Sequence, residues 1–266
     1  MIDSTLTMMT IGERELAVAQ DGTGPTVMFL HGIGGSSTVY RAQAEALAAA
    51  GFQALRPDLA GAGRSPLAST PISIDSHASD VIEILAVLNI DRVVLVGHSM
   101  GTLVARAIAA MRPELVSGLV LLGAVEAPAP PAAELIRNRA RQIRQMGSAA
   151  VAEQILNLSL SADTHRLRPE ITAFIRELIC AQDAEGYAAN NEALAAAPDP
   201  GDVAAHLPVL LVAGEKDTLS PPELSARIAA GHEKRSLAVL PGIGHWIPLE
   251  AADQVAALLV AFARRL

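Results

Sequence analysis

The stretch Val93-Val94-Leu95-Val96-Gly97-His98-Ser99-Met100-Gly101 decides the fold of this chain. A short apolar strand runs into Gly-x-Ser-x-Gly and then directly into a helical pattern over residues 100–111. A serine hydroxyl is a weak nucleophile, and a tight turn with glycines on both sides can hold it clear of the sheet. The pentapeptide also occurs in ordinary strand-to-helix turns, but its flanking strand and helix favour a nucleophile at Ser99.

Strands and helices alternate on both sides of this turn. Short β-branched runs bounded by turn residues predict strands at 7–11 and 16–19, paired as a hairpin, and at 27–30, 52–56, 93–96, 119–122, 209–213 and 236–240. Helical periodicity covers residues 38–50, 74–88, 100–111, 222–230 and 249–264. Such an alternation predicts the α/β class, with a parallel sheet covered by helices on both faces.

A Pro-rich segment at residues 126–131 interrupts the alternation. Four helical patterns then follow with no strand between them, at 132–146, 149–158 behind Ser148, 170–180 and 184–196 behind Asp183. We therefore expect residues 126–199 to form a helical insertion. Residues 1–125 and 200–266 would together form the core domain.

Composition excludes several classes of function. The 266 residues are 51% hydrophobic and 18% charged with a formal charge of −8, so the chain can bury a large core and offers no basic surface to nucleic acid. The single cysteine and seven histidines show no metal-ligand spacing, and no cofactor or metal is expected. Without a secretory signal or an apolar segment long enough to span a membrane, we expect a soluble, cytoplasmic protein. The oligomeric state stays open, with a homodimer as one option.

A serine nucleophile needs a general base and an acid that orients the base. His245 follows the predicted strand at 236–240 on a Gly-rich loop, and Asp217 follows the strand at 209–213. The chain order Ser99, Asp217, His245 is the one expected for this kind of sheet. His245 would accept the serine proton and return it to the leaving group, while Asp217 would fix the imidazole tautomer.

Other acids and histidines compete for these roles. Glu215 follows the same strand as Asp217, and Glu126 follows the strand after the nucleophile helix. We prefer Asp217 because it lies deeper in its turn. His98 is interpreted as a packed or hydrogen-bonded support for the turn.

Two backbone amides are candidates to hold the negative oxygen of the transition state. The Met100 N–H lies at the start of the helix that follows Ser99. The stretch His31-Gly32-Ile33-Gly34-Gly35 leaves the carboxyl end of the strand at 27–30, and its Ile33 N–H is the second candidate donor. His31 is expected to hold this loop through hydrogen bonds.

These motifs together resemble the α/β-hydrolase family over nearly the whole chain. The resemblance implies an eight-stranded, mostly parallel sheet whose second strand is antiparallel, with the helical insertion as a cap over the site. A serine at position 99 argues against the branches that use aspartate there. The stretches 143–147 and 185–189 are similar to 3-oxoadipate enol-lactonases and related carboxylesterases, whereas Trp246 after His245 is similar to carbon–carbon bond hydrolases.

We therefore expect a serine hydrolase that cleaves a small carboxylic ester or lactone through an acyl-Ser99 intermediate. A carbon–carbon hydrolase of vinylogous diketones and a non-catalytic ligand-binding receptor are the alternatives. The candidate substrate-binding residues are Trp246, Gly32, Ile143 and Met146, with Ile136, Ile155, Phe174 and Leu178 as further apolar residues of the cap. Arginines 137, 139, 141 and 144 either attract an acidic substrate or form a solvated helix face.

Overall fold

The computed structural model describes residues 4–266, within which one sheet has the strand order β1-β2-β4-β3-β5-β6-β7-β8. The strands are β1 (Ser4–Ile11), β2 (Arg14–Asp21), β3 (Thr26–Leu30), β4 (Gln53–Pro57), β5 (Val93–His98), β6 (Val116–Leu122), β7 (Val209–Gly214) and β8 (Arg235–Leu240). β2 runs antiparallel to both β1 and β4, and the other neighbours are parallel. This arrangement confirms the predicted eight-stranded, mostly parallel sheet.

The central strands are apolar on both faces because helices cover both faces. In β3, Val27 and Phe29 point into one hydrophobic layer. Met28 and Leu30, which alternate with them, point into the other layer. A continuous run of apolar residues therefore suits a strand that is buried on both sides.

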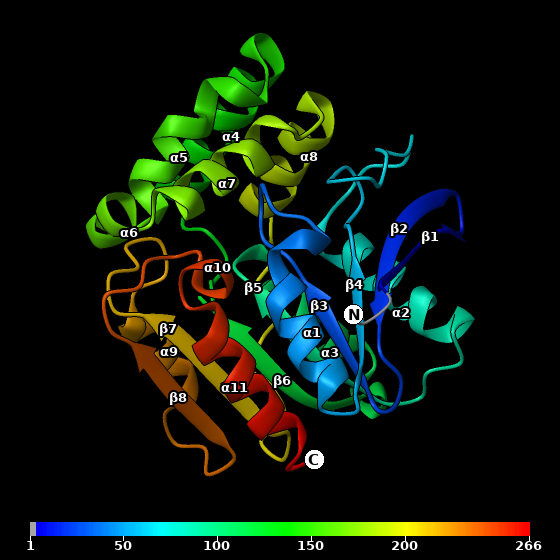
Figure 1. Ribbon diagram of the computed structural model, residues 1–266. Helices are drawn as coiled ribbons and strands as arrows, with labels where there is room; N and C mark the ends of the chain where they lie inside the picture. Colours follow the sequence, from blue (N-terminus) through cyan, green and yellow to red (C-terminus); the bar gives the residue numbers. More distant parts are fainter. Residues whose placement is uncertain (1–3) are drawn as a thin grey trace.

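The helices of the core pack on opposite faces of the sheet (Figure 1). Helices α1 (Arg41–Ala49) and α11 (Ala252–Ala263) lie side by side and share one hydrophobic layer. Helices α2 (Ile74–Val87), α3 (Met100–Met111) and α9 (Pro222–Ala229) contribute to the other layer. No helix within residues 4–266 combines the length and the apolar character needed to cross a membrane.

A group of helices lies between β6 and β7 in the chain and covers the edge of the sheet where the parallel strands end (Figure 1). We call it the cap: α4 (Pro130–Met146), α5 (Ala152–Ser159), α6 (Ala162–Leu167), α7 (Pro169–Cys180) and α8 (Ala184–Ala195). These helices fall inside the insertion expected at residues 126–199. The cap therefore stands over the loops that leave the strands at this edge.

The cap differs from the sequence prediction in two places. The helix expected at 149–158 begins instead as a 3-10 turn, Ser148–Val151, and the Ser148 hydroxyl donates to the Gln182 carbonyl rather than capping a helix. Helix α6 was not expected. Its N-cap is Ser161, whose side chain accepts from the Thr164 N–H, and a single turn and a half of helix carries too little periodicity to be recognised.

The C-terminal helix is also divided. Residues 249–264 were expected to be continuous, but α10 (Ile247–Glu250) and α11 are separated at Ala251, whose φ and ψ of −130° and 43° are not helical. This break lets α10 lie next to the loop that follows β8. Glu250 is thereby buried beside the candidate histidine.

Candidate active site

Ser99 occupies the sharp turn between β5 and α3. Its φ of 53° and ψ of −121° put a non-glycine residue in a strained region of the backbone map. The turn also brings α3 very close to β3, since a Cβ on Gly101 would lie 2.1 Å from the Leu30 carbonyl oxygen. Glycine at position 101 is therefore required for the turn that exposes the Ser99 hydroxyl.

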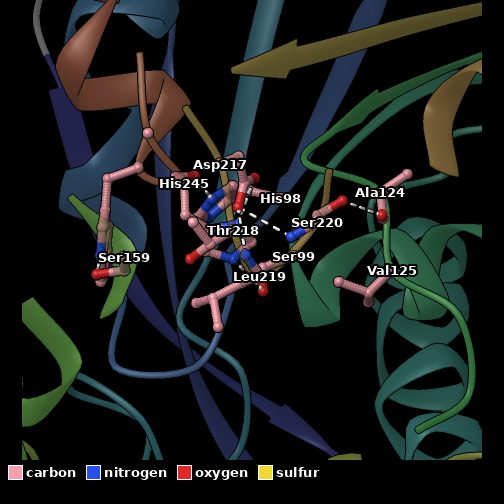
Figure 2. Close-up of polar contacts among 12 residues, drawn as sticks. His98, Ser99, Ala124, Val125, Ser159, Asp217, Thr218, Leu219, Ser220 and His245 are labelled. Atoms are coloured by element: carbon pink, nitrogen blue, oxygen red, sulfur yellow. Dashed lines mark hydrogen bonds and ion pairs between the residues drawn. The ribbon is translucent and has the colours of Figure 1, made fainter. Parts of the chain in front are cut away.

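The structure brings Ser99, His245 and Asp217 into one hydrogen-bonded chain (Figure 2). The Nε2 of His245 lies 2.9 Å from the Ser99 Oγ, and its Nδ1 lies 2.7 Å from the Asp217 Oδ2. The three side chains come from the turns after β5, β7 and β8, at the same edge of the sheet. This is the geometry in which an imidazole can take a proton from a hydroxyl while a carboxylate holds its other nitrogen.

Asp217 is fixed by its own turn as well as by the histidine. Its Oδ1 accepts the backbone N–H groups of Leu219 and Ser220, each at 2.9 Å. The Ser220 hydroxyl donates to the Ala124 carbonyl, which ties the turn after β7 to the end of β6 (Figure 2). Both oxygens of the buried Asp217 side chain therefore accept hydrogen bonds, which fixes its orientation.

The backbone of His245 is held by a carbonyl of the cap and by the side chain of His98. Its N–H donates to the Ser159 carbonyl at 2.7 Å, at the end of α5 in the cap. Its carbonyl accepts the Nε2–H of His98 at 2.7 Å. The candidate base is thus positioned from the cap on one side and from the nucleophile turn on the other.

Glu250 holds the residues on both sides of the histidine. One carboxylate oxygen accepts the Trp246 N–H and the other accepts the Gly244 N–H, both at 3.0 Å. The second oxygen also accepts the hydroxyl of Thr164 in α6 at 2.5 Å. Nothing in the sequence around Glu250 signals this role, because the contacts depend on α6 and on the break before α11.

The candidate oxyanion donors lie next to Ser99. Met100 is the first residue of α3, so its N–H has no acceptor one turn earlier in the helix. Ile33 lines the same cavity as Ser99. Gly32 does not line that cavity, but a Cβ there would lie 2.8 Å from the Ser99 Cβ, so its part is to let the loop approach the serine.

Two buried histidines support the turns around the site. The Nδ1–H of His31 donates to the Gly32 carbonyl at 2.8 Å, and its Nε2 accepts the Leu59 N–H at 3.0 Å. Burial, followed by the nearby His245, lowers the pKa of His98 to about 3. His98 is therefore neutral at ordinary pH and can keep donating its Nε2–H to the backbone carbonyl of His245.

A cavity of about 480 Å³ opens over Ser99 between the core and the cap. Its lining is mostly apolar, as is usual for small-molecule sites. The residues that line it are Ile33, His98, Ser99, Val125, Glu126, Pro128, Ala132, Leu135, Ile136, Asn138, Arg139, Gln142, Gln154, Ile155, Leu158, Leu194, Leu219, Leu224, His245 and Trp246. Trp246, Ile136 and Ile155 are thus placed where the sequence prediction expected them.

Ile143 and Met146 lie elsewhere, contrary to the expectation that they line the pocket. Ile143 is fully buried in a hydrophobic layer with other cap residues, and Met146 is 68% exposed at the end of α4. Phe174 and Leu178 are also absent from the lining. Helix α4 turns Ile143 into the packed interior of the cap and leaves Met146 exposed at its C-terminal end, while Ile136 and Arg139 face the cavity. Helix α7, which carries Phe174 and Leu178, contributes no lining residue.

Comparison with known proteins identifies the family. A family model described as the alpha/beta hydrolase fold matches residues 25–252. The chain belongs to this family.

Within residues 4–266, no three His, Cys, Asp or Glu side chains gather into a group that could hold a metal ion.

Individual members of the α/β-hydrolase family are similar to this chain over nearly its full length. A putative carbamate hydrolase, RutD, of Agrobacterium fabrum is 30% identical over 256 residues, which cover 91% of this chain and 94% of the relative. A thermophilic esterase from Thermogutta terrifontis, solved with malate bound, has a TM-score of 0.91 and 30% identity, with 99% and 98% of the chains covered. The enol-lactonase from Burkholderia xenovorans LB400 has a TM-score of 0.87 and 26% identity, with 97% and 100% covered.

Other curated relatives match over a shorter stretch. Uncharacterised mycobacterial proteins are 37% identical over 120 residues, so the aligned part spans about a third of their length, 35%. The match covers 45% of this chain. A hydrolase of the α/β-hydrolase family is the function that the comparisons support.

Proposed function

We propose that this α/β-hydrolase is a serine hydrolase that cleaves a small carboxylic ester or lactone through an acyl-Ser99 intermediate. The observation that carries the proposal is the 2.9 Å contact between the Ser99 Oγ and the His245 Nε2 in a cavity of about 480 Å³. The similarity to an esterase and to an enol-lactonase supports the same reaction class.

In the first half of the proposed reaction, the Ser99 Oγ attacks the carbonyl carbon and its proton passes to the His245 Nε2. The amides of Met100 and Ile33 donate to the oxyanion of the tetrahedral intermediate. The carbon–oxygen bond to the leaving alcohol then breaks, and His245 gives that alcohol its proton.

In the second half, water attacks the acyl group. His245 takes a proton from the water, and a second tetrahedral intermediate uses the same two amides. Collapse releases the acid and returns the proton to the Ser99 Oγ. For a lactone, the leaving alcohol stays attached to the acyl chain, and one hydroxy acid is the product.

Replacing the nucleophile tests the proposal. The Ser99→Ala variant should lower turnover of p-nitrophenyl acetate to near background, since losing a serine nucleophile commonly costs about 10⁶-fold in kcat. A fluorophosphonate should phosphonylate Ser99 with loss of fluoride, so that the mass of the phosphonyl group is added to the wild type and not to the variant. Ser79→Ala, at an exposed position of α2, is the control and should keep the wild-type rate.

Two results would contradict this proposal. An unchanged rate of p-nitrophenyl acetate hydrolysis in Ser99→Ala would show that Ser99 is not the nucleophile. Turnover of a coloured vinylogous diketone by a protein that leaves every ester and lactone untouched would favour carbon–carbon hydrolysis instead.

A further inference from the structure

Helix α4 turns one face toward the cavity above Ser99. The residues of α4 that line the cavity are Ala132, Leu135, Ile136, Asn138, Arg139 and Gln142, most of them three or four positions apart. Arg139 is the sole lysine or arginine among the lining residues of the described chain. A guanidinium group is therefore built into the roof of a mostly apolar cavity.

Arg139 differs from the other arginines of α4 in having no acidic partner. Arg137 and Arg141 pair with Glu134 at 3.5 and 2.7 Å. Arg144 pairs with both Glu185 and Glu192, on α8. Arg139 forms no ion pair with any acid of residues 4–266, and its Nε–H donates at 2.6 Å to a neutral amide, the Asn191 Oδ1.

Asn191 orients the guanidinium. Its side chain is fully buried, and its Nδ2–H donates to the Tyr187 carbonyl at 2.8 Å. The Nε–H of Arg139 is thereby anchored, while its two Nη groups make no hydrogen bond to residues 4–266. Burial lowers the pKa of Arg139, and the effect that opposes this shift comes from Tyr187 and not from a carboxylate. Since a desolvated cation without a counterion is costly, this arrangement suits a site that receives its anion from a ligand.

The acid in the cavity lining, Glu126, does not supply that anion. Both of its carboxylate oxygens lie 3.4 Å from the guanidinium of Arg227, an exposed residue of α9. The chain as a whole carries a formal charge of −8, so long-range attraction does not favour an anionic substrate either. Recognition of an anion must come from a local contact in the cavity.

We propose that Arg139 binds a second, ionised carboxylate of the substrate, so that the preferred substrates are esters or lactones that carry a free carboxylate apart from the bond that is cleaved. The two Nη groups match the two oxygens of a carboxylate in a planar, bidentate pair. This inference rests on the proposed function, because it names the substrate class of the same site.

This inference is tested by the ratio of kcat/KM for matched anionic and neutral substrates. Monoethyl succinate, glutarate and adipate carry a carboxylate where ethyl butanoate, pentanoate and hexanoate carry a methyl group. On the alcohol side, 4-acetoxybutanoate and butyl acetate form the equivalent pair. The wild type should show a higher kcat/KM for the anionic member of at least one pair, measured by titration of the released acid.

The Arg139→Gln variant should lower that anionic-to-neutral ratio by about ten- to a hundredfold, as expected for loss of hydrogen bonds to a charged group. Arg137→Gln, which removes the same charge from the same helix outside the cavity, should keep the ratio. The acyl-side and alcohol-side pairs show which half of the substrate carries the carboxylate. No anionic preference in the wild type, or an equal ratio in Arg139→Gln, would overturn the inference.

A binding measurement separates this inference from the proposed reaction. Calorimetry with adipate and with hexanoate should show tighter binding of adipate to the wild type and loss of that difference in Arg139→Gln. If no ester is hydrolysed, the proposed function fails while this result still supports the carboxylate site. If the neutral esters are hydrolysed and adipate binding does not depend on Arg139, the reaction stands and the carboxylate site is wrong.

Discussion

Asp217 is held in its buried turn because the imidazole of His245 and two backbone N–H groups donate to its two carboxyl oxygens. The amide of Asp217→Asn keeps nearly the same shape but can present an N–H to the His245 Nδ1, which favours the wrong imidazole tautomer. We expect kcat for p-nitrophenyl acetate to fall by about 10⁴-fold, with little change in the melting temperature. A larger loss in Glu126→Gln than in Asp217→Asn would assign the acid to the end of β6 instead.

At the level of the secondary-structure elements, α10 couples the cap to the histidine loop. Glu250 accepts from Gly244 and Trp246 on that loop and from Thr164 on α6. In Glu250→Gln, an amide NH₂ group replaces one of the two carboxylate oxygens. Its N–H groups then face an N–H or O–H donor that the oxygen accepted. We expect His245 to be misplaced and kcat to fall by about 10- to 100-fold, with a smaller effect on KM.

Steady-state kinetics with p-nitrophenyl acetate measure this effect. Asp253→Asn, at an exposed position in the first turn of α11, removes the same charge nearby and should behave as the wild type. Wild-type kcat in Glu250→Gln would mean that the loop is held without the carboxylate.

The stability of the whole molecule should depend on pH through its buried histidines. Burial lowers the pKa of His77 to about 4 from 6.5. The unfolded chain therefore binds a proton on this residue below about pH 6.5 while the folded chain stays neutral. The contribution of His77 to the free energy of unfolding is fully present above pH 6.5, is lost as the pH falls toward 4, and changes no further below that. The loss amounts to about 3 kcal/mol.

Urea unfolding at pH 7 and pH 4.5 checks this pH dependence. His77→Gln can still donate to the Asn190 Oδ1, the present partner of His77, and should show a smaller loss of stability than the wild type across this interval. His206→Gln, at an exposed position, should keep the wild-type pH dependence. An equal loss of unfolding free energy between pH 7 and pH 4.5 in the wild type and in His77→Gln would contradict the prediction.

The order of strands and helices could be predicted because each element carries its own local pattern. The turn at Ser99 is one example, since glycines and a strand-to-helix change lie within a few residues of each other. Helix α6 and the break at Ala251 could not be predicted in this way. Both are short, and contacts with Glu250 from a distant part of the chain stabilise the first of them.

The sequence alone was enough to predict a parallel sheet and a helical insertion between β6 and β7. It also predicted that Ser99, Asp217 and His245 lie at one edge of the sheet, because short-range backbone preferences and the order of the strands place them there. Only the tertiary structure showed that Arg139 lines the cavity while the three neighbouring arginines do not. It also showed that Ile143 and Met146 lie outside the cavity lining. The physical reason is that the side chain facing a cavity depends on the rotation of its helix, and contacts between α4 and α8 set that rotation.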